Sequence, residues 1–137
     1  MEEILTGLVK KYKAAGGTAI VQHPKTGKIL AMGSYPNFDP NNYSQSEIAT
    51  FINPAIQSVY EPGSIFKVLT MAAGIDSEAI TPETRYYDTG EIKVWDRTIK
   101  NWDLKSYGSI TMTEVIENSV NTGAVFAQKK TGNKTFY

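Results

Sequence analysis

Two β-prone runs joined by a tight turn lie near the start of the chain. Residues 18–23 and 28–33 flank the sequence Pro-Lys-Thr-Gly at 24–27, whose proline and glycine are typical of a turn. Both runs contain neighbouring apolar residues, such as Ile20 with Val21, so both faces of each strand are apolar. A hairpin of two strands is marginally stable alone and has two unpaired edges. The sequence therefore predicts strands covered on both sides or central in a larger sheet, whose other strands the chain does not contain.

Helical patterns dominate the rest of the chain. Two capping-box patterns, Ser44-x-x-Glu47 and Thr111-x-x-Glu114, mark the starts of two helices. A candidate hairpin surrounds 88–91. Further helices are predicted where apolar residues recur at helical spacing and a glycine follows as the expected end of the helix. The predicted helices lie at 2–15, 44–51, 64–74, 111–118 and 123–130. This order of elements indicates an α+β fold.

Length and composition are those of one globular domain. The chain has 137 residues, 41% of them hydrophobic, with 14 acidic and 14 basic side chains. Because the net charge is zero, no nucleic-acid partner is expected. The sequence has neither the pattern of a signal peptide nor a membrane-spanning segment, so we expect a soluble chain. Its parts are an N-terminal helix at 1–16, the β-hairpin at 17–34 and a mainly helical part at 35–137.

Composition also restricts the chemistry of any active site. The chain has one His and no Cys, which excludes disulfides, thiolate zinc sites and a cysteine nucleophile. A lone His23 disfavours a Ser-His-Asp triad and a His-rich metal site. We therefore expect no metal and no cofactor, and a catalytic base among Lys, Tyr, Asp or Glu.

Ser64 and Lys67 form the main candidate site. Residues three apart on a helix share a face, which brings the lysine amine close to the serine hydroxyl. Ser64 follows a Pro-Gly pair at the expected helix start, where free N–H groups favour negative charge. The apolar neighbours at 65–66 and 68–69 would desolvate Lys67, lower its pKa and let a neutral amine take the serine proton. The structural alternative is an N-cap serine followed by an exposed lysine.

Ser119 and Asn121 form a second candidate, just after a predicted helix. Its structural alternative is a polar turn in which the asparagine adopts a left-handed conformation. The sequence Lys-Thr-Gly, a catalytic motif when it lies on a strand, occurs at 25–27 and 130–132. The first copy is expected at the tip of the hairpin and the second at the end of a helix. Neither is therefore assigned to a site.

The other polar and aromatic residues of the middle segment are assigned to structure. Four carboxylates are scattered through a loop-rich stretch and are interpreted as surface charge: Asp88, Glu91, Asp96 and Asp103. Trp95, Trp102 and Tyr107 are interpreted as a small satellite core, with a stacking platform as the alternative.

Several segments together resemble the transpeptidase domain of penicillin-binding proteins of the monofunctional, class B type. The resemblance runs from about residue 17 to the end of the chain. Its segments are Gly-Gly-Thr-Ala-Ile-Val and Pro-Lys-Thr-Gly-Lys-Ile-Leu-Ala-Met within 16–32, and those at 35–43, 53–57, 60–68, 80–84, 97–102 and 117–123. It implies the first two strands of an antiparallel sheet plus a helical subdomain of a penicillin-binding/β-lactamase-like fold.

The resemblance also implies roles for the candidate residues. Ser64 would be the acylated nucleophile, and its backbone N–H would form half of an oxyanion hole. Lys67 would accept the serine proton, and Ser119 would relay protons toward the leaving group. Asn121 would bind the amide side of the substrate and help to hold Lys67. The substrate would be the D-Ala-D-Ala end of a peptidoglycan stem peptide, or a β-lactam.

One departure from the family pattern is large, because no Lys-Thr-Gly follows on a strand well beyond Asn121. We therefore expect residues 1–137 to be a partial transpeptidase domain with impaired activity, whose exposed strand edges promote self-association. The parent protein is expected to be extracytoplasmic and membrane-anchored. The alternatives are a β-lactamase-like domain, a β-lactam sensor and a non-catalytic scaffold.

Overall fold

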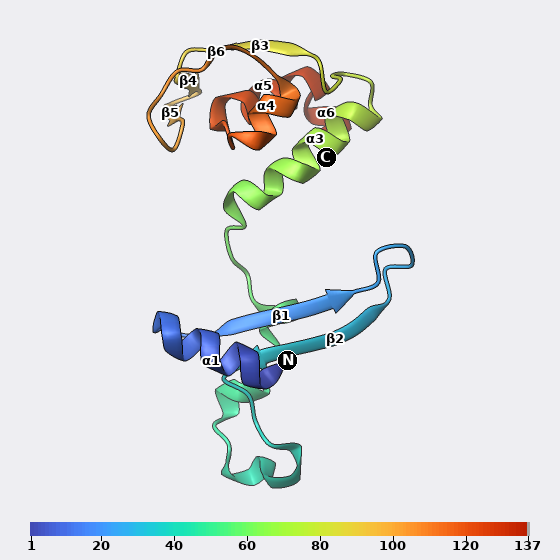
Figure 1. The fold of residues 1–137 in the computed structure, drawn as a ribbon, viewed down its shortest axis with the longest axis vertical. Helices are drawn as coiled ribbons and strands as arrows, with labels where there is room; N and C mark the ends of the chain where they lie inside the picture. The colour runs from blue at the N-terminus through green and yellow to red at the C-terminus, as the bar shows by residue number, and fades with distance from the viewer. Residues whose placement is uncertain (137) are drawn as a thin grey trace. The chain divides into compact units, whose positions relative to one another are not determined.

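The computed structural model describes residues 1–136 in two compact units, Met1–Tyr60 and Glu61–Tyr137 (Figure 1). Every strand pair in the described residues is antiparallel, and helices accompany the strands in both units. The predicted α+β class is therefore confirmed. Among residues 1–136, no helix combines the length and the apolar character needed to cross a membrane.

The first unit contains helix α1 (Glu2–Tyr12) and the hairpin of strands β1 (Gly17–Gln22) and β2 (Ile29–Tyr35). The predicted helix and hairpin are both present. The helix ends earlier than predicted because Lys13 adopts a left-handed conformation with φ 51° and ends the helical hydrogen bonding.

Helix α1 packs on one face of the hairpin. Leu5 and Val9, one turn apart, are its buried residues. A Cβ atom at Gly17 would lie 3.2 Å from both side chains, so a glycine at this position lets the helix approach the strand closely. In contrast, Ile20 and Leu30 remain exposed. Within the described residues, therefore, the apolar strands are not covered on both sides.

Three short helical segments follow the hairpin in the first unit. The predicted capping box at Ser44 is wrong. Asp39 instead caps the first segment by accepting a hydrogen bond from the backbone N–H of Asn41 at 2.9 Å. Pro40 supplies the first-turn backbone angle. The segments are η1 (Pro40–Gln45), η2 (Ile48–Phe51) and α2 (Pro54–Gln57).

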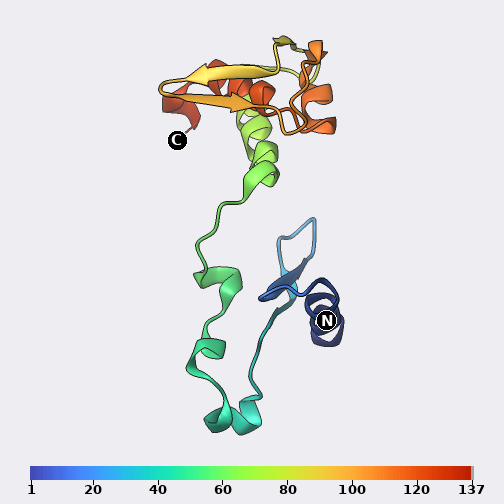
Figure 2. The same ribbon diagram turned by 90° about the vertical axis from the view of Figure 1, so that its left-hand side faces the viewer.

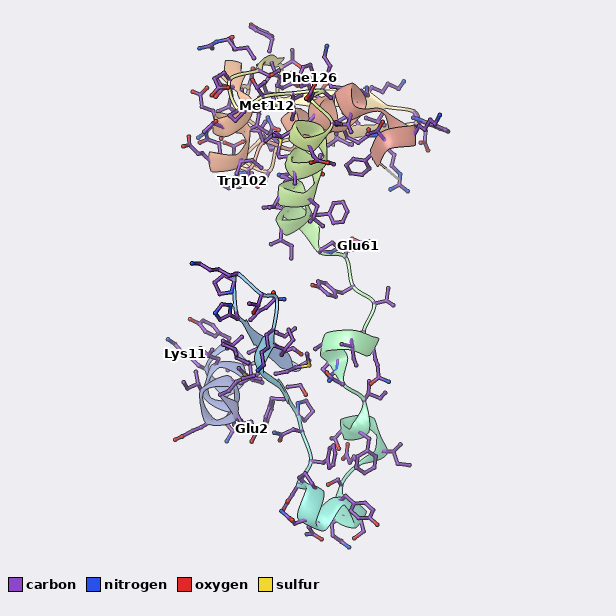
Figure 3. All side chains as sticks on the ribbon, turned by 90° about the vertical axis from the view of Figure 1, so that its right-hand side faces the viewer. Glu2, Lys11, Glu61, Trp102, Met112 and Phe126 are labelled. Carbon is purple, nitrogen blue, oxygen red and sulfur yellow. The ribbon has the colours of Figure 1, made fainter. Side chains whose placement is uncertain are left out.

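The second unit is built around one hydrophobic core. Met112 and Phe126, labelled in Figure 3, lie on two of its helices, and both pack in this core. The helical segments are η3 (Gly63–Phe66), α3 (Lys67–Asp76), α4 (Met112–Glu117), α5 (Asn121–Thr131) and α6 (Asn133–Phe136). The buried core residues are Met71, Ile80, Ile110, Met112, Val115, Val120 and Ala127.

Four short strands also lie in the second unit, within the stretch predicted as mainly helical. Strand β3 (Arg85–Asp88) pairs with β6 (Gly108–Thr111), and β4 (Glu91–Val94) pairs with β5 (Arg97–Lys100) (Figure 2). The predicted hairpin at 88–91 is therefore wrong. Strands β3 and β4 do not pair, because β3 pairs with β6 and β4 pairs with β5. Between them, the Asp88 carboxylate accepts the Gly90 N–H at 2.9 Å and turns the chain.

Helices α4 and α5 approach each other closely. The predicted capping box of Thr111 and Glu114 is present at the start of α4. A Cβ atom at Gly123 of α5 would lie 2.7 Å from Cγ1 of Val115 and closer still to Cγ2. A glycine at 123 therefore allows this contact between the two helices.

Candidate active site

The amine of Lys67 is surrounded by four oxygen atoms from three residues. Lys67 Nζ donates to Ser64 Oγ at 3.2 Å and to Asn121 Oδ1 at 2.6 Å. It also lies 2.6 Å from the carbonyl oxygen of Ser119 and 2.9 Å from its Oγ. The structure thus brings together all four residues that the sequence singled out, although more than 50 positions separate Lys67 from Ser119 and Asn121.

Ser64 and Lys67 lie on continuous helical segments. Ser64 is exposed in the turn η3, and Lys67 begins α3 one turn later. The prediction that the apolar neighbours in the chain desolvate Lys67 is wrong, because the flanking Phe66 and Val68 are exposed. Lys67 is only 9% exposed because its side chain points toward Ser119 and Asn121.

Ser119 occupies a strained backbone position at the end of α4. Its φ angle is 52°, a left-handed conformation that usually requires glycine or asparagine. Its N–H donates to Ile116 and the N–H of Val120 donates to Val115, the two hydrogen bonds of a Schellman motif. The left-handed residue is thus the serine and not Asn121, and this geometry turns both Ser119 oxygens toward Lys67.

Asn121 begins α5 and is held from two sides. Its Oδ1 accepts from Lys67, and its Nδ2 donates to the carbonyl oxygen of Lys100 at 2.8 Å. One Nδ2 hydrogen satisfies Lys100, and the second is available for another acceptor.

Burial lowers the pKa of Lys67 below its ordinary value. A protonated amine has three hydrogens and cannot serve all four surrounding oxygens at once. A neutral amine has a lone pair that can accept a hydrogen bond from the hydroxyl of Ser64 or Ser119. The site therefore favours exchange of a proton between the lysine and either serine.

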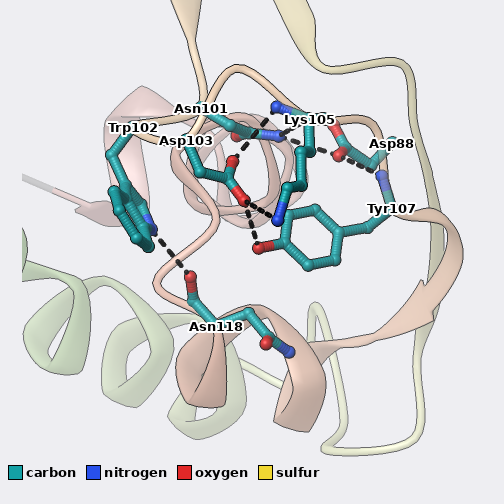
Figure 4. A network of polar contacts seen from close by, with 7 residues as sticks. All are labelled: Asp88, Asn101, Trp102, Asp103, Lys105, Tyr107 and Asn118. Carbon is teal, nitrogen blue, oxygen red and sulfur yellow. Dashed lines mark hydrogen bonds and ion pairs between the residues drawn. The ribbon is translucent and has the colours of Figure 1, made fainter.

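Asp88 was missed as a buried group. Its interpretation as surface charge is wrong, because the side chain is fully buried and the carboxylate has four neutral donors in the described residues. These are the N–H groups of Gly90 and Tyr107, the amide of Asn101 and the hydroxyl of Thr122. Figure 4 shows the hydrogen bonds from Asn101 and Tyr107. Burial acts to raise the pKa of Asp88, but these hydrogen bonds outweigh it and lower the pKa. An Asp followed by Gly two residues later signals only a turn, and the distant donors leave no local pattern in the sequence.

Asp103 and the aromatic residues also depart from expectation. Asp103 accepts a hydrogen bond from the Tyr107 hydroxyl at 2.9 Å and is not simple surface charge (Figure 4). Tyr107 packs on the main core. Trp95 and Trp102 are 91% and 71% exposed, so the predicted satellite core is wrong. The Trp102 indole donates to the carbonyl oxygen of Asn118, the residue before Ser119.

Neither copy of Lys-Thr-Gly lies on a strand in the part of the chain that the structure describes. Residues 25–27 form the turn between β1 and β2. Residues 130–132 are at the end of α5, where Gly132 follows the last helical residue.

The buried carboxylate predicts a specific pH dependence. The pKa of Asp88 is lower in the folded state, so its stabilisation is present above the unfolded pKa of about 3.9 and is lost as the pH falls through the folded value. We expect the urea midpoint of the 137-residue chain to decrease as the pH falls below about 4, and Asp88→Asn to reduce this decrease. A midpoint in wild type that stays constant over this range would contradict the assignment.

Comparisons with known proteins decide the family. A family model of the penicillin binding protein transpeptidase domain matches residues 17–137. The chain belongs to this family. Stage V sporulation protein D of Bacillus subtilis is 33% identical, and the match covers 100% of this chain and 22% of that protein. Peptidoglycan D,D-transpeptidase FtsI of Escherichia coli is 30% identical, with 87% of this chain and 20% of that protein covered. The resemblance to penicillin-binding proteins is therefore confirmed.

Two solved structures have a similar fold over nearly the whole of this chain. A putative peptidoglycan glycosyltransferase from Atopobium parvulum matches with a TM-score of 0.88 and 32% identity, covering 98% of this chain and 32% of that chain. The D,D-transpeptidase domain of a peptidoglycan glycosyltransferase from Eggerthella lenta matches with a TM-score of 0.77 and 25% identity, covering 99% and 34%. The chain spans about a fifth of the length of the curated relatives it matches.

Proposed function

We propose that this chain carries the acylating serine and its proton acceptor from a peptidoglycan D,D-transpeptidase. The observation that supports this function is the position of Lys67 Nζ, 3.2 Å from Ser64 Oγ and 2.9 Å from Ser119 Oγ. An amine of lowered pKa between two serine hydroxyls is suited to take a proton from one and deliver it through the other.

In the acylation step, Ser64 Oγ attacks the carbonyl carbon of the penultimate D-Ala of a stem peptide. The hydroxyl proton passes to Lys67 Nζ as the new C–O bond forms. The C–N bond to the terminal D-Ala then breaks, and the leaving amine receives a proton from Lys67 through Ser119 Oγ. In a β-lactam the same C–N bond lies in the ring, so the leaving group stays attached to the acyl-enzyme.

In the second step, an amine from a neighbouring peptidoglycan strand attacks the carbonyl carbon of the acyl-enzyme ester. A new amide bond forms, and Ser64 Oγ recovers a proton by the reverse path. The second Nδ2 hydrogen of Asn121 is suited to bind a substrate carbonyl beside this centre. The backbone N–H of Ser64 would form half of the oxyanion hole.

We expect slow acylation in the 137-residue chain by itself. The third family motif, a strand-borne Lys-Thr-Gly, would supply the substrate-binding strand and the other oxyanion donor. Neither copy of this sequence in the described residues lies on a strand. Loss of one oxyanion donor costs a factor of about 10² to 10³ in rate.

The function is tested with a fluorescent penicillin and intact-mass measurement. We expect a slow, stoichiometric mass increase that maps to Ser64 and disappears in Ser64→Ala. Ser109→Ala, at an exposed serine of the same unit, is a matched control that should keep the adduct. Labelling that persists in Ser64→Ala would favour a non-catalytic scaffold, and prompt acylation would refute the expected impairment.

Turnover separates the alternative functions. Release of hydrolysed penicillin at a steady rate would indicate a β-lactamase-like domain, whereas a stable adduct is expected for a transpeptidase or a β-lactam sensor. Exchange of the terminal D-Ala of a D-Ala-D-Ala peptide for labelled D-Ala would then favour the transpeptidase over the sensor.

The location and assembly of the protein are also proposals. By family membership, we propose that the parent protein acts outside the cytoplasm and is anchored to the cell membrane, where peptidoglycan stem peptides are available. The hairpin of the first unit has no further strand beside it in the described residues, so both edges expose unpaired backbone groups. We propose that the isolated chain self-associates through these edges. A monodisperse monomer at high concentration in analytical ultracentrifugation would contradict this.

A further inference from the structure

We propose that Asp88 is a positioning residue, which acts through Asn101 and Thr122 to fix the side-chain orientation of Asn121 beside Lys67. This inference rests on the proposed function, because it concerns the site that acylates. The juxtaposition that supports it is a buried carboxylate, hydrogen-bonded to the residue that directly follows Asn121.

The network starts at the Asp88 carboxylate. Thr122 Oγ1 donates to Asp88 Oδ1 at 2.6 Å, and Asn101 Nδ2 donates to Asp88 Oδ2 at 2.8 Å. All three side chains are at most 1% exposed. Because a buried carboxylate is costly unless fully hydrogen-bonded, the positions of its donors are tightly restricted.

Asn101 joins this network to the first turn of α5. Its Nδ2 faces Asp88 and the carbonyl oxygen of Lys105, so its Oδ1 must face the other way. This oxygen accepts the Thr122 N–H at 3.3 Å and lies 3.1 Å from the Thr122 hydroxyl. The helix start, a group of backbone N–H donors, is thereby fixed to the end of β5.

The same end of β5 sets the orientation of the Asn121 amide. The carbonyl oxygen of Lys100 can only accept, so Nδ2 of Asn121 must face it and Oδ1 must face Lys67. A rotated amide would direct N–H groups at the Lys67 amine and remove an acceptor from it. The backbone carbonyl of Lys100 therefore holds Asn121, and the side chain of Asn101 holds the next residue, Thr122.

Substitutions at Thr122 separate positioning from folding. Thr122→Val keeps the shape and removes the donor to Asp88, whereas Thr122→Ser keeps the hydroxyl. Asp88→Asn is the second variant, and Ile80→Val is a control in the core of the same unit. Two properties are measured on folded protein: the rate of Ser64 acylation by a fluorescent penicillin, and hydrogen exchange of the Asn121 side-chain amide by ¹H–¹⁵N NMR.

We expect Thr122→Val and Asp88→Asn each to lower the acylation rate by about 10- to 100-fold, since misplacement of a site residue by about 1 Å has effects of this size. The Asn121 amide should exchange faster in both. Thr122→Ser should acylate at a rate close to that of wild type because it keeps the hydroxyl donor, and Ile80→Val should change neither property.

The outcomes separate this inference from the proposed function. If wild type does not acylate, the proposed function fails. The exchange measurement would then still test the positioning role, and faster exchange of the Asn121 amide in Thr122→Val than in wild type would support it. If wild type acylates and folded Thr122→Val acylates equally fast with unchanged exchange, the inference is overturned. An equal loss of rate in folded Ile80→Val would also overturn it, because the effect would then follow general stability.

Discussion

Replacing Lys67 by methionine is expected to lower the rate of Ser64 acylation by about 10²- to 10⁴-fold, the usual contribution of a general base. Methionine has a similar length and keeps the apolar stem, but it offers no proton acceptor of comparable strength. Its substitution leaves Ser119 O and Asn121 Oδ1 without their donor, at a cost of about 1–3 kcal/mol. Removal of a buried amine from a desolvated position offsets part of this cost, so the variant should remain folded.

The measurement is the acylation rate with a fluorescent penicillin as a function of pH. In wild type, the rate should fall as the pH decreases, because protonation of Lys67 removes the lone pair that accepts the serine proton. This dependence should be absent from the residual rate of Lys67→Met. Lys93→Met, at an exposed lysine of the same unit, is the matched control and should acylate like wild type. Unchanged acylation in folded Lys67→Met would refute the assigned role.

Gly123→Ala is expected to destabilise the second unit by about 2 kcal/mol, although alanine is the better helix former by about 1 kcal/mol. The reason is steric, because the new Cβ would lie 2.7 Å from Val115 Cγ1 and closer still to Cγ2. Val115 is fully buried and β-branched, so it has little freedom to move away. The expected decrease in Tm is about 10 °C for a unit of this size.

Thermal denaturation of a small set of variants tests this steric explanation. Gly7→Ala is the matched control, since Gly7 lies in α1 with no atom within 4 Å of the added Cβ, and it should stabilise that helix. Val115→Ala removes both clashing methyl groups, so the double variant should be more stable than the sum of the two single effects predicts. Simple additivity of the two effects, or a Tm in Gly123→Ala equal to wild type, would show that the helices can separate without cost.

Local hydrogen bonding explains which parts of the fold were predictable from the sequence. The capping box of Thr111 and Glu114 and the turn at 24–27 depend on residues close in the chain, and both were predicted correctly. The capping box at Ser44 failed because Asp39 and Pro40 offered a better start nearby. Strand pairing in the second unit was not predicted correctly because the paired residues of β3 and β6 are 20 to 26 positions apart, from Asp88 with Gly108 to Arg85 with Thr111. At this separation, periodicity gives no information.

The sequence by itself determined that Ser64 and Lys67 share a helical face, because that proximity follows from a spacing of three residues. It also determined the family, through several short segments in a fixed order. Only the tertiary structure decided which groups surround the Lys67 amine. Three of its four neighbouring oxygen atoms belong to Ser119 and Asn121, which are more than 50 positions away in the chain. It likewise decided that Asp88 is a buried anion, because burial and hydrogen bonding by Asn101 and Thr122 depend on how distant segments pack. Desolvation is a property of the packed unit, and the pKa of a lysine or an aspartate therefore cannot be inferred from its neighbours in the chain alone.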